Sequence, residues 1–126
     1  MVSDKIPSPY IDEVYEFQGL WGIRSLCGLK AIQRGAKCII IVTELYDTNP
    51  GTTVTNWSAQ LAGELMQKYN TNPENLIFIE HTPDRKSKLE VYDETFDRVS
   101  YTWKDGKFTD PKWQRLSKQE VDKLIT

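Results

Sequence analysis

Two short runs of consecutive apolar residues stand out along the chain. Cys38 to Val42 and Leu76 to Ile79 are apolar at every position and rich in branched side chains. Such runs are typical of strands that are buried on both faces. From Thr53 to Tyr69, apolar side chains recur three or four positions apart, which predicts an amphipathic helix. We therefore expect a strand–helix–strand unit with parallel strands and a right-handed crossover.

Weaker strand patterns precede this unit. Val14 to Phe17 and Ile23 to Gln33 are predicted to be strands, and the turn before Cys38 contains Gly35. Glycine adopts positive φ at little cost, so Gly35 suits a tight turn between antiparallel strands. Residues 1–12 contain two prolines and little periodicity, which predicts an irregular N-terminal arm.

The pattern after the unit predicts a loop, a hairpin and a short helix. Residues 84–94 are polar and charged, which predicts an exposed loop, whereas Thr95 to Trp103 alternate like a half-buried strand. Asp105-Gly106 is a strong hairpin signal, with a return through Phe108. Ser117 to Glu120 form a capping-box pattern before a short C-terminal helix. The whole chain, 1–126, is expected to be one α+β domain. Its mixed, mainly antiparallel sheet would carry one long packed helix.

Charge and composition exclude several classes of protein. A net charge of −2 argues against a dedicated nucleic-acid binder, which needs a basic surface. No segment approaches the ~20 apolar residues of a membrane-spanning helix, and residues 1–10 lack the pattern of a secretory signal. Cys27 and Cys38 are expected on neighbouring strands but out of register, so they should stay unbridged. A soluble protein of the reducing cytoplasm is the simplest expectation.

Polar residues gather where the two buried strands are predicted to end. Ligands of such units collect outside the carboxyl ends of parallel strands, close to the N-terminus of the connecting helix. We therefore expect a small anionic ligand, or a protein partner, at the edge formed by residues 44–56 and 80–82. The same residue types also make an ordinary helix cap. Polar or backbone contacts would come from Asn49, Gly51, Thr52, Thr53, Thr55 and Asn56, with His81 or Arg85 supplying positive charge.

Two catalytic alternatives use the same part of the chain. A metal-assisted hydrolase would draw its oxygen and nitrogen ligands from Glu44, Asp47, Glu80 and His81. Adjacent residues of a strand point to opposite faces, which weakens the pairing of Glu80 with His81. Cys27 is a candidate nucleophile, although a small buried thiol is the simpler interpretation. No motif in the sequence assigns a metal or another cofactor.

A third class of function is an interaction subunit of an oligomer or complex. Large rings usually belong to the core, but an exposed cluster of them indicates a partner surface. The residues concerned are Trp21, Trp57, Trp103 and Trp113. Residues 84–94 are compatible with either a plain solvated loop or a lid over the same edge.

Several of these segments together resemble a motif of small bacterial proteins that carry no established activity. The motif comprises Thr43-Glu44-Leu45, Asp47, the run from Asn49 to Asn56, Ile79-Glu80-His81 and Glu94-Thr95-Phe96-Asp97. The resemblance covers about a third of the chain and implies no catalytic residue. Thr48 departs from a tighter Asp-Asn-Pro-Gly version of the loop.

Overall fold

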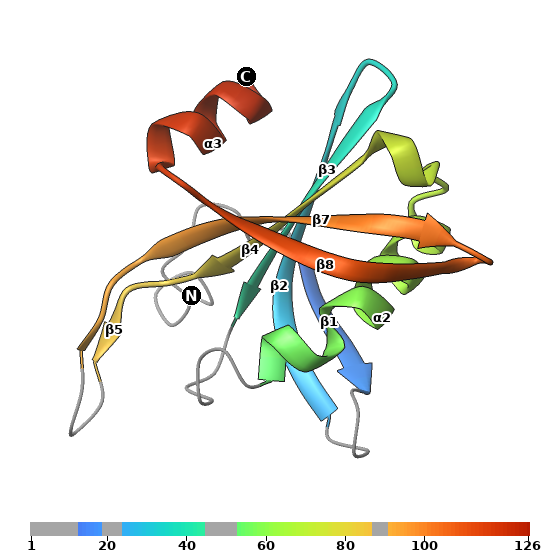
Figure 1. The fold of residues 1–126 in the computed structure, drawn as a ribbon. Coiled ribbons are helices and arrows are strands. Elements are labelled where there is room, and N and C mark those ends of the chain that lie inside the picture. The colour runs from blue at the N-terminus through green and yellow to red at the C-terminus, as the bar shows by residue number, and fades with distance from the viewer. Residues whose placement is uncertain (1–12, 19–23, 45–52, 87–90) are drawn as a thin grey trace.

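The apolar runs predicted to be strands lie at the centre of a six-stranded sheet (Figure 1). The computed structural model describes residues 13–18, 24–44, 53–86 and 91–126, so the predicted N-terminal arm lies outside the described residues. The strand order is β1-β2-β3-β4-β7-β8. These strands are β1 (Glu13–Gln18), β2 (Arg24–Arg34), β3 (Lys37–Glu44), β4 (Leu76–Thr82), β7 (Thr95–Lys104) and β8 (Lys107–Leu116).

The sheet is mixed, and the chain belongs to the α+β class, as the sequence predicts. The β1–β2, β2–β3, β4–β7 and β7–β8 pairs are antiparallel. The central β3–β4 pair is parallel, and helix α2 (Thr53–Lys68) lies between these two strands in the chain. A single 3-10 turn, η2 (Pro73–Asn75), leads into β4. No helix among the described residues is long and apolar enough to cross a membrane.

Local signals in the sequence account for the turns and for the last helix. Gly35 has a φ of +60°, as expected for the turn between β2 and β3. Asp105 and Gly106 have φ values of +52° and +75°, the two positive angles that a tight hairpin turn requires. Ser117 and Glu120 form the predicted capping box at the start of α3 (Lys118–Ile125).

The sheet separates two apolar cores because successive strand residues point to opposite faces. The core on what we call the α2 face contains Leu61 and Leu65 of α2. The core on the α3 face contains Val121 of α3. The strand residues divide between them by alternation, with Cys38, Ile40, Val42 and Phe78 on the α2 face and Ile39, Ile41, Ile77 and Ile79 on the α3 face.

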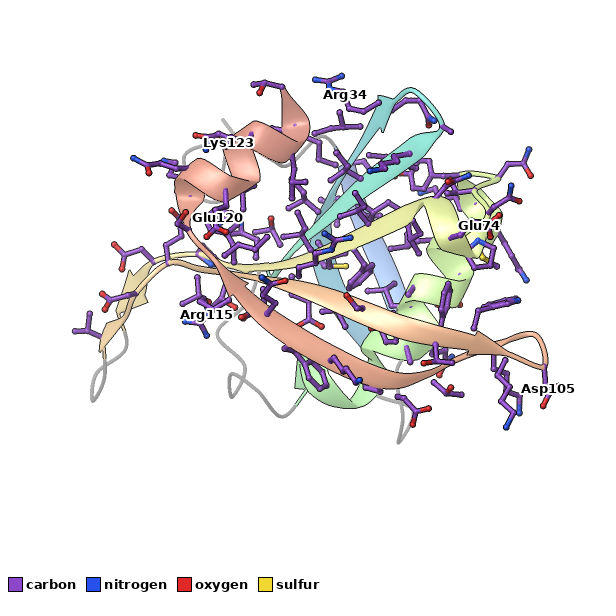
Figure 2. The ribbon with its side chains drawn as sticks, turned by 45° about the horizontal axis from the view of Figure 1, so that its top comes forward. Arg34, Glu74, Asp105, Arg115, Glu120 and Lys123 are labelled. Atoms are coloured by element: carbon purple, nitrogen blue, oxygen red, sulfur yellow. The ribbon has the colours of Figure 1, made fainter. Side chains whose placement is uncertain are left out.

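A hydrogen bond joins helix α3 to the β2–β3 hairpin. Figure 2 shows Arg34 at the tip of the β2–β3 hairpin, near the end of α3 that carries Lys123. The Arg34 guanidinium donates a hydrogen bond to the backbone carbonyl of Ile125. A cation at the C-terminus of a helix also interacts favourably with the helix dipole.

Two predictions about strands need correction. Residues 84–94, predicted to be a plain exposed loop, contain a small two-stranded sheet of β5 (Arg85–Lys86) and β6 (Val91–Tyr92). The hairpin predicted to return through Phe108 continues to Leu116 as a full strand of ten residues, β8. Figure 1 shows β5 beyond β4, at the far end of β7 from the β7–β8 turn.

Candidate functional site

The strongest polar cluster lies near the carboxyl ends of the two parallel strands. Thr43 of β3 and His81 of β4 are directly opposite each other in the parallel register. Their exposed fractions are only 0% and 1%, respectively. Buried polar side chains are costly unless they are hydrogen-bonded, so their partners decide what they contribute.

Thr43, His81 and Glu94 form a continuous chain of hydrogen bonds, which we call the His81 chain. The Thr43 hydroxyl lies 2.9 Å from His81 Nδ1, and His81 Nε2 lies 2.8 Å from a carboxylate oxygen of Glu94. Phe96, which pairs with His81 in the β4–β7 ladder, stacks on the imidazole with a centroid distance of 4.5 Å and an interplanar angle of 9°. The His81 chain reaches the protein surface at Glu94. The side chain of Glu94 is 31% exposed, whereas that of His81 is 0% exposed.

The surroundings of His81 disfavour the charged form of its imidazole, so the neutral form predominates at neutral pH. Burial lowers its pKa below 6.5, and the hydrogen bond and negative charge of Glu94 offset only part of that shift. Lys118 adds a small contribution in the same direction as burial. An ionised carboxylate can only accept hydrogen bonds, so Nε2–H donates to Glu94. Nδ1 of the neutral ring must then accept the hydroxyl hydrogen of Thr43.

The lowered pKa predicts that stability falls in mild acid. The unfolded chain takes up a proton at His81 before the folded protein does as the pH decreases. The His81 contribution is therefore fully present above the unfolded pKa near 6.5, and is lost progressively below it until the folded pKa is reached. Urea unfolding at about pH 7.5 and about pH 5.5 measures this loss.

The sequence contains one histidine, so a matched variant isolates this effect. His81→Gln should show a smaller decrease in stability between the same two pH values, whatever its absolute stability. An equal decrease in the parent protein and the variant would show that other groups cause the pH dependence.

A second polar cluster lies on the opposite face of the same strands. Glu80 and Asp97 are direct partners in the β4–β7 ladder, which places two acidic side chains next to each other. The indole Nε1 of Trp113 donates to a Glu80 oxygen at 3.3 Å, and Nε of Arg115 donates to an Asp97 oxygen at 2.8 Å. Strand β8 thus supplies a donor to each carboxylate. Like charges opposite each other are otherwise destabilising in a sheet.

The structure places the predicted site residues unevenly. His81 lies in the His81 chain, whereas Glu80 belongs to the cluster on the other face, so the geometry does not bring these two side chains together. The structure describes only the backbone of five other candidates. Glu44 is the last residue of β3, and Arg85 is the first residue of β5. The first turn of α2 contains Thr53, Thr55 and Asn56. Their side chains, together with Asp47, Asn49, Gly51 and Thr52, lie outside the described residues.

Among the described residues, the structure shows neither a metal-ligand group nor an exposed thiol. The described residues contain no group of three or more His, Cys, Asp or Glu side chains that is placed to hold a metal ion. Cys27 is buried and unbridged, and burial raises the pKa of its thiol to about 12. At neutral pH such a thiol is protonated and a poor nucleophile.

We expect both cysteines to be unreactive in the folded protein. Cys27 and Cys38 are 1% and 3% exposed, respectively, so a thiol reagent can reach neither without opening of the core. Titration with Ellman's reagent should detect no fast-reacting thiol in native buffer and both cysteines in denaturant. Rapid native labelling of Cys27 would restore it as a candidate nucleophile.

Sequence reasoning missed Thr43 and Glu94 as partners of His81. Both belong to segments of the sequence motif. The β4–β7 register also pairs Glu80 with Asp97 and His81 with Phe96, which joins the Ile79-Glu80-His81 segment to the segment that contains Glu94. The motif segments that the structure describes therefore converge around the end of β4. No protein-family model, curated protein or solved structure matches the chain.

Proposed function

We propose that the protein is a non-catalytic binding protein whose ligand is a small anion held at the edge formed by residues 44–56 and 80–82. The His81 chain is the observation that carries this proposal. Its imidazole is buried with both ring nitrogens engaged, and its hydroxyl is buried too. A substrate atom cannot reach the Thr43 hydroxyl or the His81 ring nitrogens. The His81 chain is therefore better suited to holding the strand ends in place than to transferring protons.

The start of α2 supports an anion rather than a cation at this edge. The first turn of α2 carries no acidic residue, so the partial positive charge at its N-terminus is not neutralised from within the helix. Gly51, Thr52 and Thr53 are the expected backbone donors, with Thr55 and Asn56 as polar contacts. Because the pKa of His81 is lowered, we propose Arg85 rather than the imidazole as the source of the compensating positive charge.

A thermal-shift titration tests the proposal. Inorganic phosphate, nucleotides, phosphorylated metabolites and carboxylates are compared at constant ionic strength, with chloride as the reference anion. A ligand at 100 times its dissociation constant stabilises the folded state by about 2.7 kcal/mol. We expect an anion from this panel to raise the melting temperature, and the double variant Thr52→Val, Thr53→Val to reduce the increase, because it removes two hydroxyls and keeps the backbone N–H groups.

The control is Thr102→Val, an exposed threonine of β7 in the β7–β8 hairpin. It should retain the full thermal shift. An anion-induced shift of unchanged size in the double variant would contradict the binding role and make Thr52 and Thr53 simple helix caps. If no anion in the panel has any effect, the small-anion proposal fails and a protein partner becomes the better explanation, which mass measurement of the assembly in solution tests.

The order of groups in the His81 chain supports one catalytic alternative. A hydroxyl, an imidazole and a carboxylate in sequence is the arrangement that activates a nucleophilic hydroxyl, with Thr43 passing its proton to His81 Nδ1. The complete burial of Thr43 ranks this acyl-transfer function below binding. A fluorophosphonate probe distinguishes the two functions, because only a catalytic Thr43 gives a covalent adduct that Thr43→Val prevents.

The other two functions expected from the sequence have weaker support. A metal-assisted hydrolase would need Glu80 and His81 in one site, together with Glu44 and Asp47. An interaction subunit draws support from Trp103 and Trp113, which are 41% and 40% exposed. These two rings lie at different positions on the β7–β8 hairpin and do not form one patch. The indole N–H of Trp113 already donates a hydrogen bond to Glu80.

A further inference from the structure

A groove lies between α2 and the tip of the β7–β8 hairpin, away from the His81 chain. It has a volume of about 400 Å³ and is open to solvent. Gly63, Glu64 and Met66 line it from α2, and Trp103, Lys107 and Phe108 from the hairpin. Figure 2 shows Asp105 at this hairpin tip, with Arg115 towards the other end of β8. Small-molecule sites usually measure about 300–1,000 Å³, so the groove is large enough for a compact ligand.

Two aromatic rings form a corner on the hairpin side of the groove. The Trp103 and Phe108 rings meet edge to face, with centroids 4.7 Å apart and an interplanar angle of 66°. Phe108 is held from behind by Tyr101 at 5.3 Å, and Tyr101 by the buried Phe78 at 6.2 Å. Trp103 nevertheless remains 41% exposed. The core therefore supports a fixed aromatic surface that faces solvent.

Glu64 supplies a carboxylate on the α2 side of the groove. The described residues give it no ion pair or hydrogen bond, and partial burial raises the pKa of its carboxyl group. No cation among the described residues lies over Trp103 or Phe108, although Lys68 does lie over the ring of Tyr69. A carboxylate that lines the same groove as two aromatic rings is complementary to a weakly hydrated positive charge.

We propose that this groove binds a small organic cation, with a quaternary ammonium group against Trp103 and Phe108 and its charge balanced by Glu64. The electron-rich ring faces and the carboxylate attract the same charge, while the methyl groups of the ligand fill the apolar part of the groove. Lys107 also lines the groove, and its positive charge repels a cationic ligand, which lowers the affinity. The groove uses the second half of α2, so this inference stands or fails independently of the proposed anion site.

Choline chloride is the probe, and its neutral isostere 3,3-dimethylbutan-1-ol is the matched control. The full-length protein is titrated with each at constant ionic strength, and amide and indole resonances are followed by NMR. We expect choline to shift the Trp103 indole and the backbone signals of Gly63 and Glu64. A cation–π contribution of about 1–2 kcal/mol corresponds to binding of the neutral isostere that is about tenfold weaker.

Three substitutions test the assigned roles. Trp103→Leu keeps an apolar side chain but removes the indole, and Glu64→Gln removes the charge at nearly constant shape. Both should weaken choline binding several-fold, whereas Lys107→Gln should strengthen it because a like charge is lost. Melting temperatures of the three variants show whether each protein is still folded.

Three outcomes would overturn the inference. Equal affinity for choline and its neutral isostere would reduce the groove to an apolar depression. Absence of shifts at the groove residues would remove the site. Much tighter binding of a trimethyllysine peptide than of choline would reassign the groove to a protein partner.

Discussion

Replacing His81 with alanine is expected to lower the free energy of unfolding by about 3–5 kcal/mol, as for the loss of other large buried rings. The substitution removes a ring that is 1% exposed and stacked on Phe96, and leaves a cavity between β4 and β7. It also removes the hydrogen-bond partner of the buried Thr43 hydroxyl. An unsatisfied buried polar group adds its own desolvation cost. Urea unfolding at about pH 7.5, where the ring is neutral, measures the loss.

Two milder variants separate packing from hydrogen bonding. Glu94→Gln retains an oxygen that can accept from His81 Nε2–H and should cost about 1 kcal/mol or less. Thr43→Val keeps the shape of the side chain but leaves Nδ1 without its donor, and should cost about 1–3 kcal/mol. In the His81→Ala background, Thr43→Val should cost much less, because the two residues act as one unit. A loss below about 1 kcal/mol for His81→Ala would contradict the observed packing.

The centre of the fold was predictable because short-range signals agree with the long-range structure there. The run from Cys38 to Val42 is apolar at each position, and the structure buries it on both faces of the sheet. Gly35 and Asp105-Gly106 stand where positive φ is needed, and Ser117 caps the last helix. Each signal depends on residues close in the sequence, so no tertiary information was necessary.

The start of strand β8 was predicted from the hairpin signal, but its full length to Leu116 was missed because its later residues lack regular apolar alternation. Its ten residues include Asp110 and Pro111, which are unfavourable in the interior of a sheet. Asp110 has a φ of +51°, and the β7–β8 register shifts between Ser100 and Thr102. A charged, proline-containing and irregular edge discourages pairing with other chains. The composition that protects the edge is therefore the same one that resembles a loop.

The candidate site was predictable only in part for a related reason. His81 stood out as the only histidine, and its position at the end of an apolar run placed it near the carboxyl edge. Its partners depend on the register of strands distant in sequence. Glu94 returns to His81 because the small β5–β6 sheet reverses the chain before β7 begins. Single-sequence patterns do not contain this pairing.

Phe78→Ala is expected to be as damaging as the loss of His81, at about 3–5 kcal/mol. Phe78 is 1% exposed in β4 and pairs with Ile40 on one side and Val99 on the other. It lies in the core covered by α2 and contacts the ring of Tyr101 edge to face. No small movement of one element can close the resulting cavity, because strands on both sides fix the position of β4.

The controls for Phe78 are a conservative change at the same position and a truncation at the surface. Phe78→Leu should cost less than Phe78→Ala because it leaves a smaller cavity. Val14→Ala, at a residue that is 52% exposed, should stay within about 0.5 kcal/mol. Urea midpoints with unchanged m-values give the comparison. Phe108 packs against Tyr101, and Tyr101 packs against Phe78. Phe78→Ala should therefore also weaken choline binding at the groove more than Phe78→Leu does. Equal stability of the Phe78→Ala and Val14→Ala variants would show that the aromatic series is not anchored in the core.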